Sequence, residues 1–467
     1  MGTMVTAATI SLVQLEPRPV HGLLLLVVVA TVVAALVERL LREADSSPWR
    51  RRVREPRTAI AILCGMLVGT LLGPAVFGRL APELAEDMLL GARAERESLV
   101  AIERELSAFT HAAGAAGTAP AIVESDLAAR LADQDVADER YREATWDAQR
   151  PARLAVVLLA SVVLATACLR LNGSLPEARD CVATPGLDPD DPSATPAPTR
   201  VHRLADAVTI GLFGASIASL LGLLALRVWE EPLFGPSAFI TLAALAIGPW
   251  IPSPEAIGIL ERHEPRGGDL VRRAAAVSSG AAALLLGAVL LTNSVELGRE
   301  GRLTLLAVVA VLGVSSLVGL LRPLRAPAGD VATTWARGLT LTALPALAAL
   351  ATSRIEWILD FSIAPVLVLP LLSSDGRSAG VFLGAAAAGG RSFAGWARLM
   401  ISSAATGPTQ LAVVAVGLWL ELLPGWLGAG LLLGVGLIEC TRWMRRAAAV
   451  AIRVEEARMG RKRDDLS

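Results

Sequence analysis

The sequence predicts an all-α, polytopic membrane protein with about 11–13 transmembrane helices. Of its 467 residues, 54% are hydrophobic, and the mean hydropathy is +0.55. A soluble protein of this length does not carry so many uncharged apolar runs of about 20 residues. Two of these runs are interrupted in the middle by glycine and proline, which predicts two broken helices.

The ionisable residues exclude several classes of function. The formal net charge is −1, and the arginines are dispersed instead of lining one helical face, so nothing indicates nucleic-acid binding. The four cysteines and four histidines show no metal-ligand spacing. No nucleophile–base constellation is visible either. We therefore expect neither an enzyme nor a bound metal or cofactor.

Arginines in the first loop set the expected orientation in the membrane. The first two spans, 21–41 and 58–77, enclose a loop with four arginines between residues 50 and 54. The positive-inside rule places this loop in the cytoplasm and the N-terminus outside, as in a bacterial inner-membrane protein. Further spans are expected at 151–171, 205–228, 234–260, 270–291, 303–321, 332–351, 355–372, 396–420 and 425–443. Their alternation gives a cytoplasmic C-terminus with a basic tail at 447–467.

Residues 84–150, which follow the first two membrane helices (1–83), are strongly charged. Acidic residues outnumber arginines about two to one there, which favours the outer side of the membrane. Apolar residues recur at helical spacing on both sides of a Gly/Ala-rich break at 112–120. We expect an extracytosolic acidic helical hairpin, followed by the membrane helix 151–171.

Two other segments do not have the character of a membrane span. Residues 172–203 are rich in Pro, Asp, Thr and Gly, which predicts a flexible cytosolic linker. Residues 376–390 are mostly Gly and Ala and too short to span comfortably. For this stretch an interfacial segment, a re-entrant segment and a closely packed helix all stay open. The whole of 204–446 is expected to form a membrane transport-like domain.

The two interrupted runs lie inside 204–446. The break at 247–255 contains three prolines, and the break at 404–410 contains Gly407 and Pro408. At membrane depth such breaks survive only inside protein or beside water. Paired breaks in corresponding halves of a transporter mark its binding site. Because the two runs are expected to cross in opposite directions, they match inverted repeats whose broken helices cross.

Three short motifs occur in order along the chain: LGPAVFG at 72–78, IGPWIPSPEA at 247–256 and GPTQLA at 407–412. Together they resemble the early LGPS-x-x-G motif and the two broken helices of the monovalent cation:proton antiporter superfamily, the sodium/proton exchanger-like group. The resemblance implies an inverted-repeat fold, alternating access and a second domain that often dimerises. It also implies that a proton and a cation compete for membrane carboxylates, whose pKa burial raises.

The sequence departs from that family at the ion-binding residues. The helix 270–291 has Ser278 and Ser279 where the family places one or two aspartates, and its interior holds no acid. The Thr-Asp pair of the first break is also absent, and the one lysine, Lys462, lies in the tail. The usual aspartate mechanism is therefore not available to this chain.

Candidate ion-binding residues lie at the breaks. Glu255, with Ser253 beside it, could bind a cation or proton next to carbonyls that the prolines release, or could cap the second half-helix. The second break offers Thr406, Thr409 and Gln410.

Other candidates lie outside the breaks. Ser278 and Ser279 could ligate sodium, or could allow close helix packing. Glu356 and Asp360, four residues apart on one expected helical face, could carry a proton, or could be solvated acids paired with Arg354. We interpret Glu439 as a structural ion pair with Arg442, three residues on.

We expect a secondary transporter that exchanges a small monovalent cation, Na⁺ or K⁺, for protons, with lipid and a second copy of the chain as partners. The alternative is a non-transporting membrane sensor or complex subunit that reuses the same scaffold. In that case residues 84–150 would be the partner-binding region.

Overall fold

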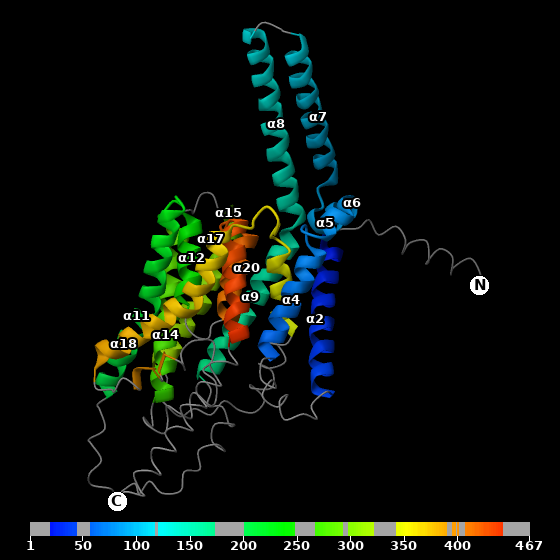
Figure 1. Cartoon of the computed structure of the whole chain (residues 1–467). Coiled ribbons are helices and arrows are strands. Elements are labelled where there is room, and N and C mark those ends of the chain that lie inside the picture. Colours follow the sequence, from blue (N-terminus) through cyan, green and yellow to red (C-terminus); the bar gives the residue numbers. More distant parts are fainter. Residues whose placement is uncertain are drawn as a thin grey trace, which may run out of the picture.

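The computed structural model describes residues 19–43, 57–116, 120–172, 200–247, 267–292, 298–321, 342–389, 395–397, 399–400 and 407–441. These residues form helices joined by turns, and no strand occurs among them. Figure 1 shows a bundle of helices from which two further helices project. We call the end of the bundle that bears this projection the hairpin face.

Seven helices within the described residues are long and apolar enough to cross a membrane. They are Gly22–Leu40, Thr58–Leu80, Arg150–Ala167, Leu204–Val228, Leu270–Thr292, Gly301–Leu320 and Ile363–Ala388. Shorter apolar helices occupy Pro236–Ala246, Thr342–Thr352, Gly407–Trp419 and Gly425–Thr441. The all-helical fold is thus confirmed, and the long apolar helices are consistent with a polytopic membrane protein.

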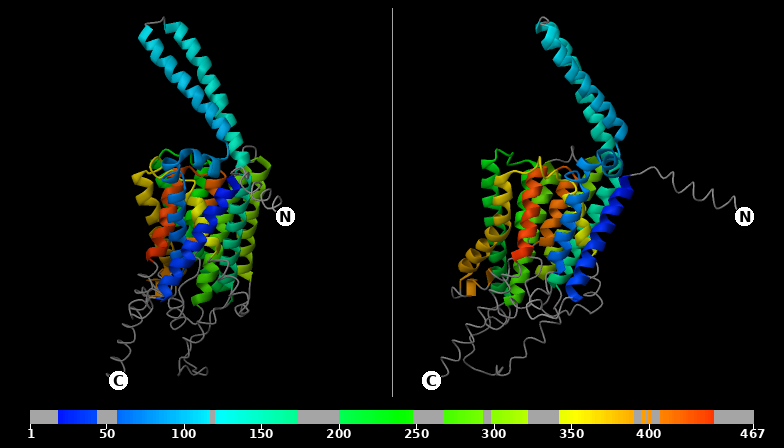
Figure 2. Two further views of the ribbon diagram at one scale, coloured as in Figure 1. Left: turned by 90° about the vertical axis from the view of Figure 1, so that its right-hand side faces the viewer. Right: turned by 45° about the vertical axis from the view of Figure 1, so that its right-hand side comes forward.

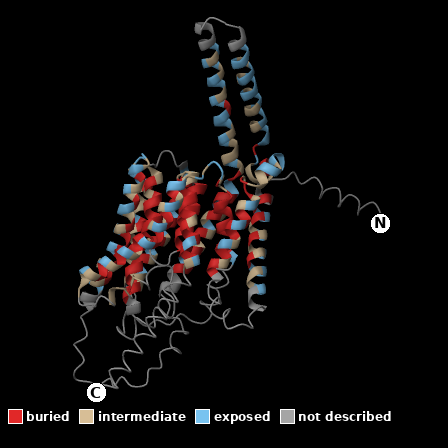
Figure 3. Ribbon diagram, viewed as in Figure 1, coloured by how far each residue is buried: buried red, intermediate tan, exposed pale blue. Residues whose placement is uncertain are grey.

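The long helices surround two short ones. The outer helices are α2 (Pro19–Glu43), α4 (Arg57–Leu72), α9 (Arg150–Asn172), α11 (Arg200–Val228), α14 (Gly267–Thr292) and α15 (Gly298–Leu321). The short helix α12 (Pro236–Ala246) packs against α11, α14 and the second short helix, α20 (Gly407–Trp419). Helix α20 also packs against α9. Buried residues concentrate at this centre in Figure 3, and every residue of α20 is buried.

The outside of the bundle is apolar, as lipid contact requires. Helix α2 exposes a stripe of leucine and valine, and α15 exposes another. The exposed members include Leu24, Val28, Val32 and Leu36 on α2 and Leu303, Leu306, Val314 and Leu317 on α15. Water would penalise surfaces of this size, so a lipid environment accounts for them.

Small residues bring the helices close together. A side chain on Gly69 of α4 would overlap with Thr352 and Ala349. Gly380, on α18 (Arg377–Ala388), lies against the backbone of Phe213 in α11 in the same way. Helices in lipid gain their contacts by such close approach, since apolar surface is not expelled from lipid as it is from water.

The stretch from 355 to 390 differs from the prediction. Residues 355–362 form turns instead of the start of a span, and α17 (Ile363–Leu371) begins after Ser362, with Pro365 in its first turn. A π-helical turn, η2 (Leu372–Gly376), then leads directly into α18. The segment 376–390 is therefore mainly the second half of one long helix, not a separate one. Pro370 lies inside α17, two residues before this widened turn.

Residues 84–150 form the projecting hairpin. Helices α7 (Arg93–Ala116) and α8 (Pro120–Ala148) lie side by side and leave the bundle together in each view of Figure 2. Three short elements lie at their base: α5 (Phe77–Leu80), α6 (Pro82–Ala85) and the π-helical η1 (Glu86–Leu90). At about 1.5 Å per residue, α7 extends some 36 Å beyond this base.

A buried acid anchors the hairpin. Glu86 is 2% exposed, forms an ion pair with Arg96 of α7 and accepts a hydrogen bond from Tyr141 of α8 at 3.2 Å. Gln149 donates to the Leu89 carbonyl at 3.0 Å. Burial, together with the charge of Glu86, raises the pKa of Tyr141 to about 12.

The titration of Tyr141 tests this anchor, since Tyr141 is the sole tyrosine of the chain. Its folded-state pKa of about 12 exceeds the ordinary 10.0. Tyr141 therefore stabilises the fold below pH 10, and this contribution is lost as the pH rises through 12. At about pH 11, the ultraviolet absorbance of tyrosinate should be low in folded protein and high in denatured chain. Glu86→Gln should lower the folded-state pKa; an unchanged value would contradict the anchor.

Candidate functional site

Helix α12 ends inside the bundle. It has 11 residues, about half the length of a membrane span, and it is buried from Ile240 to Ala246. Arg377 of α18, 3% exposed, donates through Nη2 to the Leu245 carbonyl and, at 3.4 Å, to the Ala244 carbonyl. The C-terminal end of a helix carries partial negative charge, so the guanidinium complements it. An intramembrane arginine therefore caps this half-helix.

The first described residue of helix α20, Gly407, lies inside the bundle. A side chain on Gly407, its first residue, would overlap with the Glu439 carboxylate, which therefore lies beside the start of the helix. Glu439 is 1% exposed and accepts a hydrogen bond from Thr58 Oγ1 at 3.1 Å. The N-terminal end of a helix carries partial positive charge, which a carboxylate complements. A buried carboxylate therefore lies beside Gly407, where its charge is opposite in sign to the helix dipole.

The two capped ends converge on one stretch of helix, Ser373–Arg377. Gln410 of α20 donates through Nε2 to Ser373 Oγ at 2.8 Å and to the Leu431 carbonyl at 3.4 Å. Arg377, which holds the end of α12, lies four residues after Ser373. Gly417, near the other end of α20, lies against Ile240 of α12. The two short helices therefore run in opposite directions along each other.

Gln410 has one oxygen that the described residues leave unsatisfied. The side chain is fully buried, and its Oε1 has no hydrogen-bond donor among the described residues. A buried acceptor without a partner costs about 1–3 kcal/mol. The Thr241 hydroxyl of α12, also fully buried, lacks a partner there as well. A cation, water or proton donor at Gln410 Oε1 would recover this energy.

The serines of α14 serve the packing of helices. Ser278 Oγ bonds to the Gly211 carbonyl of α11 at 3.1 Å and to the Ala274 carbonyl at 3.2 Å. Ser279 Oγ bonds to the Ala275 carbonyl of its own helix at 3.0 Å. Both hydroxyls thus donate hydrogen bonds to backbone carbonyls of packed helices. This geometry favours the interpretation that the two serines serve helix packing over the interpretation that they ligate sodium.

Glu356 and Asp360 lie far from the half-helix ends, at the hairpin face. They do not share a helical face, because residues 355–362 are turns: the Glu356 backbone N–H donates to Asp360 Oδ2 at 2.8 Å. Glu356 pairs with Arg79 at 3.2 Å, while Arg354 pairs with Glu421 at 3.0 Å, so the expected partner was wrong. Burial raises the pKa of Asp360, the backbone N–H of Glu356 lowers it, and the Glu356 charge raises it.

A cavity of about 650 Å³ opens beside these acids, between the hairpin base and the bundle. Its lining includes Glu86, Arg96, Tyr141, Arg354, Glu356, Asp360 and Trp419. Trp419 is the last residue of α20, so the cavity reaches the hairpin-side end of that helix. It is of the size that small ligands occupy in proteins.

Several predicted residues lie outside the described part of the chain. These are Glu255, Ser253 and Thr406, and with them the first break after Ile247, residues 404–406 of the second break, and Arg442. Thr409 is described and is buried in the first turn of α20 beside Gln410. Within the described residues, no group of three or more His, Cys, Asp and Glu side chains could hold a metal ion.

Sequence reasoning missed Arg377. The polar run that precedes it, SSDG at 373–376, is typical of a loop, whereas here it forms a π-helical turn. The available signal was the length of the surrounding run, because Ile363–Ala388 is long enough to cross a membrane with an arginine near its middle. Charged residues in that position are functional candidates.

No model of a known protein family matches the chain, and no curated protein matches it.

Removing the cap of α12 should destabilise the bundle. Arg377→Met leaves the Leu245 and Ala244 carbonyls without this donor, at a cost of about 2 kcal/mol. The melting temperature in detergent should fall by several degrees, and Arg377→Lys should restore part of the loss. Arg299→Met, at the exposed start of α15, is the matched control and should change little. Equal melting temperatures for Arg377→Met and Arg299→Met would contradict the capping role.

Proposed function

We propose that the chain is a secondary membrane transporter that exchanges a small monovalent cation for protons by alternating access. The observation that supports this most is Gln410 Oε1, a buried acceptor without a donor among the described residues, on a half-helix that begins inside the bundle. An acceptor-only position favours a cation or a proton donor as its occupant. Na⁺ and K⁺ are hard cations for which such oxygens are suitable ligands.

Glu439 is the proposed proton-carrying residue. It is the buried acid beside Gly407 of α20, whereas the exchanger-like family places its aspartates at the positions of Ser278 and Ser279. An ionisable side chain at membrane depth is costly and therefore a candidate for function. Glu255 and Ser253, which follow α12 in the sequence, remain proposed ligands on the other half-helix.

Arg377 adds a fixed positive charge to this proposed site. Its guanidinium occupies the negative end of α12, where a transported cation would otherwise find carbonyl ligands. The cation is therefore proposed to bind on the α20 side, at Gln410 Oε1 and Ser373 Oγ. The cavity that reaches Trp419 is the proposed approach from the hairpin face, which the arginine-rich loop at 42–57 would place outside the cell.

Ion-driven proton flux tests this proposal directly. Purified protein in liposomes that hold a pH-sensitive dye should release protons when Na⁺ or K⁺ is added. Gln410→Leu removes the acceptor oxygen and should lower the rate at least about tenfold, a loss of about 1.4 kcal/mol or more. Glu439→Gln should uncouple cation binding from proton release.

The matched control is Ser279→Ala, because that hydroxyl bonds only within its own helix and its loss should leave the rate within about twofold. A wild-type rate of proton flux in Gln410→Leu would contradict the proposed role of Gln410 as a cation ligand. No flux with any monovalent cation would refute the exchanger.

The second candidate is a sensor or complex subunit, and one set of contacts favours it. Arg354 Nη1 donates to Gln149, at the hairpin base, at 2.8 Å, and its Nη2 pairs with Glu421, just after α20, at 3.0 Å. Its guanidinium also lies 5.1 Å from the Trp419 ring centroid. A force on the hairpin would reach α20 through this arginine.

Replacing residues 93–148 by a short Gly/Ser linker separates the two candidates. A sensor should lose its function while the bundle still inserts into the membrane. A transporter should keep cation-dependent proton flux in liposomes. Full flux after the deletion would therefore refute the sensor, and a folded bundle without flux would refute a self-sufficient exchanger.

A further inference from the structure

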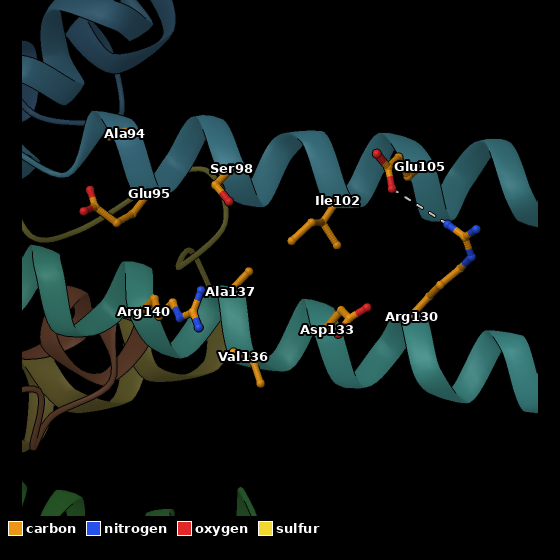
Figure 4. A pocket seen from close by; sticks show the side chains of 10 residues that line it. All are labelled: Ala94, Glu95, Ser98, Ile102, Glu105, Arg130, Asp133, Val136, Ala137 and Arg140. Carbon is orange, nitrogen blue, oxygen red and sulfur yellow. Dashed lines mark ion pairs between the residues drawn. The ribbon is translucent and has the colours of Figure 1, made fainter.

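The hairpin carries a groove along part of its length. A cavity of about 530 Å³ lies between α7 and α8, well away from the half-helix ends. Figure 4 shows the side chains that line it. They are Ala94, Glu95, Ser98, Ile102 and Glu105 from α7 and Arg130, Asp133, Val136, Ala137 and Arg140 from α8. The groove covers about three helical turns.

The apolar residues of this groove are poorly covered. Val136 is 52% exposed, and Ile102 is half-buried. Ala137 is the one groove residue that the hairpin buries fully within its described part. Among the described residues, no third helix packs along α7 and α8 to cover these side chains. A third helix laid along the groove would bury them.

The charge of the hairpin selects the kind of partner. Helices α7 and α8 carry twelve acidic side chains and six arginines. In the groove, Arg130 already pairs with Glu105 at 3.9 Å and lies 4.7 Å from the Phe109 ring centroid. Glu95 and Asp133 form no ion pair with a basic side chain among the described residues. A second copy of the hairpin would bring the same excess of acid and be repelled. A basic partner would be attracted.

We propose that the groove between α7 and α8 binds a basic amphipathic helix of a partner protein. The apolar face of that helix would cover Ile102 and Val136, and its lysine or arginine side chains would lie beside Glu95 and Asp133. Small Ala94 and Ala137 allow its backbone to approach closely. The inference depends on the hairpin alone and holds whether or not the bundle transports ions.

Synthetic helices test the proposal on the full chain. The probe is a fluorescent peptide of about 18 residues, five helical turns, with leucine on one face and lysine on the other. The protein is placed in nanodiscs of zwitterionic lipid, and binding to empty nanodiscs is subtracted. The Leu/Lys peptide should bind, and a Leu/Glu peptide of the same pattern should bind at least about tenfold more weakly.

Matched variants separate the groove from the overall charge. Asp133→Arg, inside the groove, should weaken binding about tenfold, whereas Asp135→Arg makes the same change of charge outside it and should cost less than about threefold. Val136→Asp should also weaken binding about tenfold. All three positions are exposed, so folding is not at risk.

Three outcomes would overturn the proposal. If Asp133→Arg and Asp135→Arg weaken binding of the peptide equally, the net charge of the hairpin attracts it and the groove does not bind it. Unchanged binding of the peptide to Val136→Asp would mean that its apolar face does not cover Val136. A change of oligomeric state in Val136→Asp, measured by mass photometry of the nanodiscs, would assign the groove to a second copy of the chain.

Discussion

A helix that stops inside a membrane leaves backbone groups that lipid cannot satisfy, and the structure is organised around that constraint. The end of α12 and the start of α20 both lie within the bundle. Arg377 holds the carbonyls of the first, and Glu439 lies beside the amides of the second. Each charge is opposite in sign to the partial charge of the helix end beside it, so each buried ion and its helix end stabilise one another.

These caps explain features that are otherwise unrelated. Gly407 must be glycine because the Glu439 carboxylate occupies the space of a side chain. The long helix from Ile363 to Ala388 supplies both Ser373 and Arg377, and therefore positions the two short helices relative to each other. Among the described residues of these two helices, Gln410 Oε1 and the Thr241 hydroxyl are buried without a hydrogen-bond partner. A transported ion is the proposed occupant of the position beside Gln410 Oε1.

Much of the fold could be predicted because apolar length and proline chemistry are local properties. The end of α12 at Ala246 agrees with the Gly-Pro that follows at 248–249, and Gln410 was a candidate from the second break. The caps could not be predicted, because they depend on distant pairs: Arg377 and Leu245 are 132 residues apart, and Thr58 and Glu439 are 381 apart. The helix expected from 355 failed because the Asp360 carboxylate closes a turn on the Glu356 amide.

The position of a bound cation tests the central proposal most directly. Thallium(I) substitutes for monovalent cations and scatters X-rays anomalously, so crystals soaked in a thallium salt would locate it. The account predicts an anomalous peak in direct contact with Gln410 Oε1 and Ser373 Oγ, and its loss in Gln410→Leu. A peak at the end of α12 in place of the Arg377 guanidinium, or no peak inside the bundle, would contradict it.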